Sequence, residues 1–530
     1  MTDTHVTTAA TPDSGGVERR TFLKQAGAVT GAVLASASMA NVAFAATPAA
    51  EITGWDATVL SARIKAKDVS CVEVMDAYLA QIKRFNPRIN AIIGMADEGA
   101  LRAQAAERDR QLAAGQYLGW MHGFPQAIKD TALAKGFVYT SGSPLLKGNI
   151  AKYDSVIVER AKAAGAIVIG KTNVPEWALG SNTFNPLWGT TWNPYDLKKT
   201  VGGSSGGAGA ALAMRMLPVA DGSDMGGSIR NPSAYNNVYG LRPGAGTVPL
   251  APSPEVFVQQ YAIEGPMGRT VKDVAMLLSV QAGHDPRAPL SVQLDTAQFT
   301  GDLQSDVKGK KIAWMGDWNG YFAMEPGVID LCKSSLKVFE SLGCIVEEAV
   351  PAFDPAMLWK IWLTQRAWIM GNYLGDYYAN PAQRPLLSDN ARWEVEQSFK
   401  LTANDVFQTS AMRSAWVTDA VRTFFEKYDF AIAPTAQVFP FDATIPWPRE
   451  VGGRKMETYH QWMGIVLPWT LAGTPVMNLP VGFSAGGVPM GVQLIGKRQA
   501  ELAVIKMAHA YEAATQWVQK RPPAILGLRG

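Results

Sequence analysis

The chain has 530 residues, with 49 lysines and arginines against 46 aspartates and glutamates, a formal net charge of +3. This near balance indicates neither a nucleic-acid partner nor an affinity for an acidic membrane surface. Three scattered cysteines, Cys71, Cys332 and Cys344, are too few for a disulfide scaffold, although pairing between two of them stays open. Because no Cys/His cluster has ligand spacing, we expect no metal, and nothing in the sequence calls for an organic cofactor.

The first 45 residues have the pattern of a twin-arginine export signal. Arg19 and Arg20 precede Phe22-Leu23, an apolar run rich in Ala and Gly follows, and Ala43-Phe-Ala45 fits a small-residue cleavage site. An N-terminal membrane anchor is less favoured, because the run is short and Asn41 interrupts it. We therefore expect residues 1–45 to be removed and residues 46–530 to form a periplasmic or secreted domain without stable membrane insertion.

The rest of the chain alternates helices and strands. Helices are expected at 56–64, 71–85, 98–114, 155–164, 208–216, 328–342 and 501–515, and strands at 123–130, 166–170, 311–315, 344–347, 429–434 and 488–495. No linker and no internal repeat divides the chain. The alternation favours an α/β fold with a mixed sheet covered by helices on both faces.

Between residues 357 and 469 the chain becomes rich in aromatic residues at loosely helical intervals. They are Trp359, Trp362, Trp368, Tyr373, Tyr377, Tyr378, Trp393 and Trp416. Most are expected to pack in the core, where aromatic side chains bury large areas. A minority is a candidate for an apolar substrate funnel, and the sequence leaves open which tryptophan, if any, contacts substrate.

Residues 201–239 contain two Gly-Gly-Ser units, which end at Ser204 and Ser228. Gly is used where the backbone turns sharply or approaches another group closely, and consecutive N–H groups can cradle an anion. A phosphate loop would need Gly-Lys-Ser/Thr in this stretch, which lacks it. A flexible linker is not expected either, because 208–216 continues as a helix. Serine chemistry is the favoured interpretation.

A serine nucleophile needs a general base. The candidates among the histidines are His122, His284, His460 and His509. None lies in a Gly-x-Ser-x-Gly context, which weakens a Ser-His-Asp triad, although chain order alone does not exclude one. Lys129 lies between apolar neighbours in the strand-like segment 123–130 and is the other candidate base. The simpler interpretation of a lone lysine is a solvated surface residue.

Three motifs together resemble the amidase signature family. They are Gly123-x-Pro125-x-x-x-Lys129-Asp130, Gly202-Gly-Ser204-Ser-Gly-Gly207 and Asp224-x-Gly-Gly-Ser228-Ile-Arg230-x-Pro232. Further similar blocks, among them 170–176, 240–243 and 487–496, extend the likeness over residues 55–520. The resemblance implies a single large α/β/α domain with a central mixed sheet, and hydrolysis of carboxamides by a Ser-Ser-Lys triad.

The resemblance assigns the three members of this triad. Ser228 is implied as the nucleophile, Ser204 as a serine that relays protons, and Lys129 as the general base. A free lysine has a pKa near ~10.4 and is protonated at neutral pH. Burial beside Ala127 and Ile128 is expected to lower the Lys129 pKa to about 7–8.

The residues around Ser228 are expected to form an oxyanion hole. Its donors would be the backbone N–H groups of Met225, Gly226, Gly227 and Ser228. Asp224 and Arg230 are expected to brace this loop; the alternative is a surface ion pair worth under about 1 kcal/mol. Ser205 is expected to cap the helix that follows.

The leading interpretation is an exported amidase that hydrolyses a small-molecule carboxamide to a carboxylate plus amine or ammonia. A second one keeps the triad but acts on a cyclic amide, an aryl amide or an ester. Two further alternatives are a component of an amidotransferase complex, which the export signal argues against, and a non-catalytic binding protein. Intact Lys129, Ser204 and Ser228 argue against the latter. The substrate and the oligomeric state, a homo-oligomer included, stay open.

Overall fold

The largest sheet holds the strands that carry the predicted nucleophile. A computed structural model describes residues 47–258 and 260–528, so the predicted export signal lies outside the described residues. An eight-stranded sheet has the order β12-β11-β13-β17-β16-β9-β10-β8. The strands are β8 (Ala220–Asp224), β9 (Tyr239–Arg242), β10 (Ile263–Gly268), β11 (Lys311–Trp314), β12 (Ile345–Glu348), β13 (Phe430–Pro434), β16 (Val476–Phe483) and β17 (Pro489–Ile495). β11 pairs in parallel with β12 and β13, and the other pairs are antiparallel, which confirms a mixed sheet.

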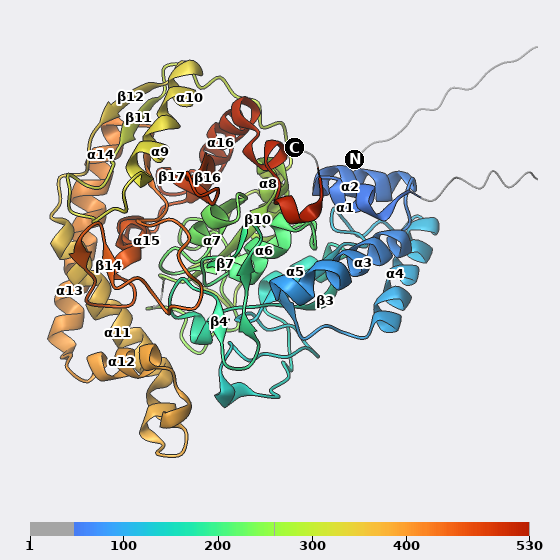
Figure 1. Cartoon of the computed structure of the whole chain (residues 1–530), viewed down its shortest axis with the longest axis horizontal. Coiled ribbons are helices and arrows are strands. Elements are labelled where there is room, and N and C mark those ends of the chain that lie inside the picture. Colours follow the sequence, from blue (N-terminus) through green and yellow to red (C-terminus); the bar gives the residue numbers. More distant parts are fainter. Residues whose placement is uncertain (1–46, 259, 529–530) are drawn as a thin grey trace, which may run out of the picture. The chain divides into compact units, whose positions relative to one another are not determined.

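Helices cover both faces of this sheet (Figure 1). Side chains of successive strand residues point to opposite faces. Ile312 and Trp314 of β11 accordingly belong to one core cluster, and Ala313 between them belongs to another. The first cluster includes residues of α8 (Val271–Gln281), α9 (Val328–Ser334) and α16 (Glu501–Thr515), and the second includes residues of α11 (Pro355–Ala379), α14 (Arg422–Lys427) and α15 (Leu467–Ala472). The α/β/α arrangement is therefore confirmed.

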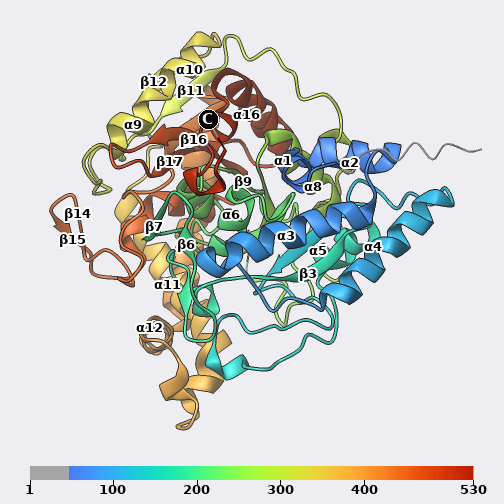
Figure 2. The ribbon, with the colours of Figure 1, turned by 45° about the vertical axis from the view of Figure 1, so that its right-hand side comes forward.

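A smaller sheet brings Lys129 into the interior. It consists of β1 (Ile92–Ile93), β3 (Ile167–Thr172) and β2 (Pro125–Lys129), with β2 parallel to β3. All residues of β2 are buried, and α3 (Cys71–Ile89) and α4 (Glu98–Ala113) pack against each other beside this sheet (Figure 2). The backbone N–H of Lys129 donates to Asp221 Oδ2 of β8 at 3.0 Å, which ties the two sheets together at this point.

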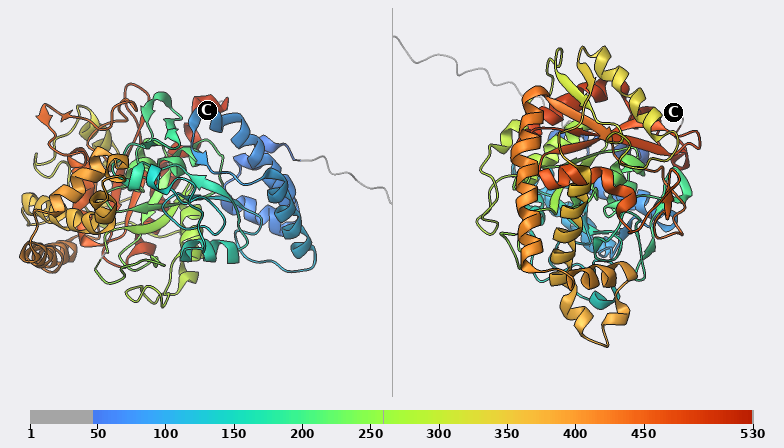
Figure 3. Two further views of the ribbon diagram at one scale, coloured as in Figure 1. Left: turned by 90° about the horizontal axis from the view of Figure 1, so that it is seen from below. Right: turned by 90° about the vertical axis from the view of Figure 1, so that its left-hand side faces the viewer.

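The aromatic segment after residue 355 forms a helical layer. The 25-residue helix α11 lies beside α12 (Asp389–Ser398) and α13 (Ala403–Ala415), as the right-hand view of Figure 3 shows. Asp354 accepts a hydrogen bond from Ala356 N at 2.9 Å, and Pro355 follows as the first helical residue. This is a favoured way to begin a helix, because proline lacks the N–H that would stay unpaired there.

Most expected elements are present, but one helix is divided. The segment expected as a single helix over 328–342 is α9 followed by α10 (Leu336–Ser341). Between them Ser335 Oγ donates to the Cys332 carbonyl at 2.6 Å, a local bond that competes with the helical pattern. Within the described part of the chain, no helix is both long and apolar enough to cross a bilayer.

The cysteines do not pair. Cys71, Cys332 and Cys344 are all free and buried. Burial raises the pKa of the Cys332 thiol above its ordinary value. Such thiols behave as small apolar side chains.

Candidate active site

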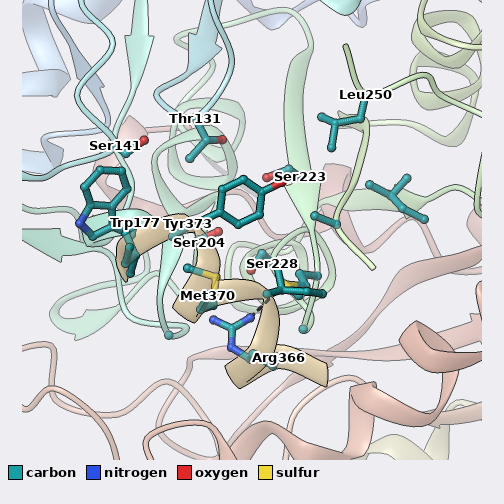
Figure 4. Close-up of a pocket in the computed structure, with 18 of the residues that line it drawn as sticks. Thr131, Ser141, Trp177, Ser204, Ser223, Ser228, Leu250, Arg366, Met370 and Tyr373 are labelled. Atoms are coloured by element: carbon teal, nitrogen blue, oxygen red, sulfur yellow. Dashed lines mark hydrogen bonds between the residues drawn. The ribbon is translucent and has the colours of Figure 1, made fainter. Parts of the chain in front are cut away.

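A cavity of about 390 Å³ contains both predicted serines. Ser204 and Ser228 line it together with Ser223 and Thr131, as Figure 4 shows. Ser228 is 8 % exposed and Ser204 1 %, so Ser228 is the more accessible of the two. No histidine occurs among the described residues that line this cavity, which removes support from a Ser-His-Asp arrangement.

Lys129 lies behind these serines at the end of β2. Its side chain is 1 % exposed, so the alternative of a solvated surface lysine is wrong. Its Nζ lies 2.8 Å from Ser204 Oγ, 2.8 Å from Ser205 Oγ and 2.9 Å from Ser223 Oγ, and 3.1 Å from the Ser223 carbonyl oxygen. An ammonium group has three protons to donate, whereas a neutral amine also has a lone pair that can accept a serine proton.

Burial favours the neutral form of the Lys129 amine. Desolvation lowers the pKa of Lys129 to about 7, against the opposing charges of Asp224, Asp221 and Glu264. Two features of the site weaken the effect of these carboxylates on the Lys129 pKa. The Asp224 charge is already paired with Arg230 at 2.9 Å. Burial and the nearby Asp221 raise the pKa of Glu264 to about 8, so Glu264 is largely neutral at pH 7.

The Gly-Ser segment turns into α6 (Gly206–Ala213) directly after the serines. The Gly203–Ser204 peptide bond is cis. A Cβ on Gly207 would lie 2.4 Å from the Asn173 backbone nitrogen, so only glycine fits this close approach. The backbone N–H of Ser205 donates to the Ser228 carbonyl at 3.0 Å, which joins the two Gly-Gly-Ser units.

The predicted capping role of Ser205 is wrong. Ser205 occupies the N-cap position of α6, but its side chain makes no capping hydrogen bond. Its hydroxyl instead accepts from Lys129 Nζ at 2.8 Å and from Ser223 N at 3.3 Å. A buried amine that lacks water requires acceptors, and this requirement outweighs the local preference for capping.

In the loop after β8, one of the four predicted oxyanion donors is already hydrogen-bonded among the described residues. The Gly227 N–H donates to Asp224 Oδ1 at 2.9 Å, so its assignment to the oxyanion hole is not supported. Gly227 has φ +93°, a conformation that glycine adopts readily and that directs this amide inward. Met225, Gly226 and Ser228 have backbone N–H groups that no hydrogen bond among the described residues uses.

Asp224 and Arg230 lie in the core. Both side chains are 0 % exposed, so the alternative of a surface ion pair is wrong. Asp224 also accepts from the backbone N–H of Ile229 at 3.1 Å, and Arg230 donates to the Val466 carbonyl at 2.8 Å. Burial alone would raise the pKa of Asp224, but the charge and hydrogen bonds of Arg230, with the charge of Arg242, lower it below its usual value. Loss of one partner from such a pair costs about 3–5 kcal/mol.

One face of α11 forms an aromatic wall of the cavity. Its lining residues are Trp362, Arg366, Ile369, Met370, Tyr373, Leu374 and Tyr377. Their spacings of three and four are those of a single helix face. Of the aromatic residues expected in this segment, Trp362, Tyr373 and Tyr377 line the cavity, whereas Trp416 is fully buried in the core.

Some lining residues were absent from the sequence-based candidates. They include Trp177, Glu264 and Arg366. The helical spacing from Trp362 is a signal that could have led to Arg366, since the two residues are four apart. Glu264 lies directly opposite Ser223 in the antiparallel register of β10 and β8, which only the fold shows.

Known proteins resemble this chain over most of its length. A family model described as Amidase matches residues 73–505. An acylamidase of Rhodococcus erythropolis is 34% identical over 475 residues, covering 88% of this chain and 96% of that protein. A glutamyl-tRNA(Gln) amidotransferase subunit of Cyanothece sp. is 34% identical over 485 residues, with 87% and 98% covered.

Two solved structures have the same fold over nearly their whole length. A bacterial aryl acylamidase of the amidase signature family aligns with a TM-score of 0.83 and 28% identity, covering 90% of this chain and 99% of that one. A 6-aminohexanoate cyclic dimer hydrolase aligns with a TM-score of 0.80 and 26% identity, covering 89% and 99%. The chain therefore belongs to the amidase signature family and is a hydrolase of carbon–nitrogen bonds other than peptide bonds.

Proposed function

We propose that the protein is an exported amidase that cleaves small carboxamides through an acyl-enzyme on Ser228, with Ser204 and Lys129 completing the triad. The observation that carries this proposal is the 2.8 Å contact between Lys129 Nζ and Ser204 Oγ, beside a cavity that Ser228 also lines. The low pKa of Lys129, about 7, supports its role as a base, because a substantial fraction is neutral at physiological pH.

Acylation in this mechanism begins with two proton transfers. Neutral Lys129 takes the proton of Ser204 Oγ while Ser204 takes that of Ser228, and Ser228 Oγ forms a bond to the amide carbon. The N–H groups of Met225, Gly226 and Ser228 stabilise the negative oxygen that results. The Lys129 proton then passes through Ser204 to the amide nitrogen, the carbon–nitrogen bond breaks, and the amine leaves.

Deacylation uses the same groups in the opposite direction. A water molecule gives its proton through Ser204 to Lys129 and attacks the ester carbon. The ester bond to Ser228 then breaks, Ser228 Oγ recovers the proton, and a carboxylate is released. The net reaction is amide plus water to carboxylic acid plus amine, and the acid then gives its proton to solvent as the carboxylate. No metal or organic cofactor takes part in the proposed steps.

Aryl amides are the substrates that the cavity walls favour. Trp177, Trp362, Tyr373 and Tyr377 line the cavity, and the rings of Trp177 and Tyr377 are 5.5 Å apart. Such walls suit a flat apolar group, because aromatic side chains favour offset or edge contacts with other rings. The name of one structural relative, an aryl acylamidase, points to the same class.

Amine or ammonia release from a panel of amides tests the proposed function. The panel contains anilides, linear alkyl amides, a cyclic amide, a dipeptide amide and glutamine, each with Ser228→Ala as the blank. Release of phenol from a phenyl ester measures ester hydrolysis in parallel. We expect anilides to be cleaved with the highest kcat/KM. Release from glutamine alone would favour the amidotransferase alternative, and release from no amide would contradict the proposal.

Export is tested by changing the paired arginines. Replacement of Arg19 and Arg20 by lysine is expected to keep the precursor in the cytoplasm, because the export pathway reads both guanidinium groups. Fractionation followed by immunoblotting measures the distribution between cytoplasm and periplasm. Lys24→Arg, a change beside the motif that leaves the pair intact, is the control. Normal export of the double variant would contradict a twin-arginine signal.

A further inference from the structure

Arg366 presents a fixed cation to the catalytic cavity. It belongs to the lining face of α11 and is 6 % exposed. Its Nε donates to Glu394 Oε1 at 2.7 Å, and its Nη2 donates to Tyr459 Oη at 3.0 Å. Tyr459 Oη in turn donates to Glu394 Oε1 at 2.5 Å. The guanidinium also lies over the Trp362 ring, 5.1 Å from its centroid. These contacts hold the side chain in one orientation.

The opposite edge of this guanidinium lacks an oxygen acceptor among the described residues. A guanidinium has five N–H donors, and Glu394 and Tyr459 occupy the edge formed by Nε and Nη2. On the edge formed by Nη1 and Nη2, Nη1 contacts Met225 Sδ at 3.1 Å. A thioether sulfur is a weak acceptor. In Figure 4 two nitrogen atoms of Arg366 point toward the cavity, on the side of Ser228.

The surroundings of Arg366 leave its charge dominant on the cavity wall. Among the described lining residues it is the one lysine or arginine, and Glu264 is the one carboxylic acid. Glu264 is largely neutral at pH 7, because burial raises its pKa to about 8. Behind Arg366, burial and the Arg366 charge lower the pKa of His460 far below its ordinary value, so His460 is neutral. Glu394 supplies one negative charge on the side away from the free edge.

We propose that the free edge of Arg366 binds a carboxylate of the substrate, so that the enzyme selects amides with an apolar body and an anionic group near the scissile bond. A carboxylate has two oxygens in the geometry that matches two parallel N–H groups, and it is a stronger acceptor than the Met225 sulfur. The contact with Met225 also places the cation beside the loop that carries Ser228. This inference rests on the proposed function, since the same cavity holds the reacting amide.

Matched substrates with and without a carboxylate measure this selectivity. Glutaranilic acid and valeranilide release the same aniline and differ in the acid at the end of the acyl chain. 4-Acetamidobenzoate and acetanilide place the charge on the amine side instead. We expect a higher kcat/KM for the charged member of at least one pair, and the better pair identifies the side of the scissile bond that faces Arg366.

Two variants are expected to change this selectivity in opposite directions. Arg366→Lys keeps the charge but loses the pair of parallel N–H donors. It should lower the ratio of kcat/KM for the carboxylate substrate to kcat/KM for its neutral partner by about 10- to 100-fold, mainly through KM. Glu394→Gln keeps an acceptor for Arg366 Nε but removes the negative charge behind it, and should raise the same ratio. A residue that only supports the fold would lower turnover of both substrates alike.

Binding to an inactive variant separates this inference from the proposed function. Calorimetric titration of Ser228→Ala with glutaranilic acid and with valeranilide measures affinity without turnover. Tighter binding of the acid, lost when Arg366→Lys is added, supports the inference even if no amide is hydrolysed. Equal binding of the two ligands, or a loss of equal size for both in the Arg366 variant, overturns it while the proposed hydrolysis stands.

Discussion

Lys129→Ala is expected to lower the rate of amide hydrolysis by at least about 10⁴-fold, because the proposed triad would act as a unit and Lys129 would be the member that accepts the serine proton. The variant keeps Ser204 and Ser228 but leaves both without a buried amine. Steady-state release of aniline measures the loss, and circular dichroism checks the fold. Lys135→Ala, at an exposed lysine near the same strand, is the matched control. A folded Lys129→Ala enzyme with nearly full activity at neutral pH would refute the assignment.

The pH dependence of wild-type kcat/KM follows from the same group. In the proposed mechanism Lys129 acts as a base in its neutral form, and burial lowers its pKa from 10.5 to about 7. The neutral fraction therefore grows as pH rises, so activity should increase through a single limb centred near pH 7 and level off above it. Lys129→Arg should be inactive at every pH, because arginine stays protonated. If a Lys129 variant with residual activity shows the same rise of kcat/KM with pH, that rise reports the titration of another group.

The fold class could be predicted from the order of the elements. Helices and strands alternate along the chain, and mixed pairing follows when short turns and helical crossovers both occur. The division of the expected 328–342 helix at Ser335 was not predictable from apolar spacing, because it depends on one hydroxyl bonding to the Cys332 carbonyl.

The lysine and the two serines became candidates through their motifs, and the burial of Lys129 needed the structure. A lone lysine in a strand is usually at the surface. Here β2 lies against β8, held in part by the bond from the Lys129 N–H to Asp221, and this contact between segments about ninety residues apart removes the amine from water. Long-range contacts of this kind leave no local pattern in the sequence.

Two local predictions failed where a buried charge required a partner. Ser205 has the position and the residue type of a helix cap, yet its hydroxyl contacts Lys129 Nζ. Gly227 has the expected place in the glycine turn, yet its N–H bonds to Asp224. In both cases the cost of leaving a buried ionisable group without hydrogen bonds exceeds the smaller gain from a cap or an open donor.

Ser228→Ala is expected to remove both hydrolysis and covalent labelling by a fluorophosphonate, because Ser228 is the more accessible serine of the pair and its own N–H is free to join the oxyanion hole. Ser204 is 1 % exposed and lies 2.8 Å from Lys129 Nζ, a position suited to passing protons. Ser204→Ala should therefore slow turnover by about 10²–10⁴-fold, the usual contribution of a positioned proton donor or acceptor, while some labelling at Ser228 remains.

The double variant and the site of the label decide between the two serines. If Ser204 and Ser228 act in one series of proton transfers, the double variant should be hardly slower than Ser228→Ala alone. The loss of Ser228 already stops the series, so the further loss of Ser204 has little left to remove. Mass spectrometry of the labelled wild-type peptide locates the tag, and Ser223→Ala, which removes another hydroxyl next to Lys129, is the control for indirect effects on the amine. A tag on Ser204 or Ser205 with Ser228 unmodified would mean that the roles are reversed. The Lys129 amine would then activate its direct neighbour, and Ser228 would serve only to hold the substrate.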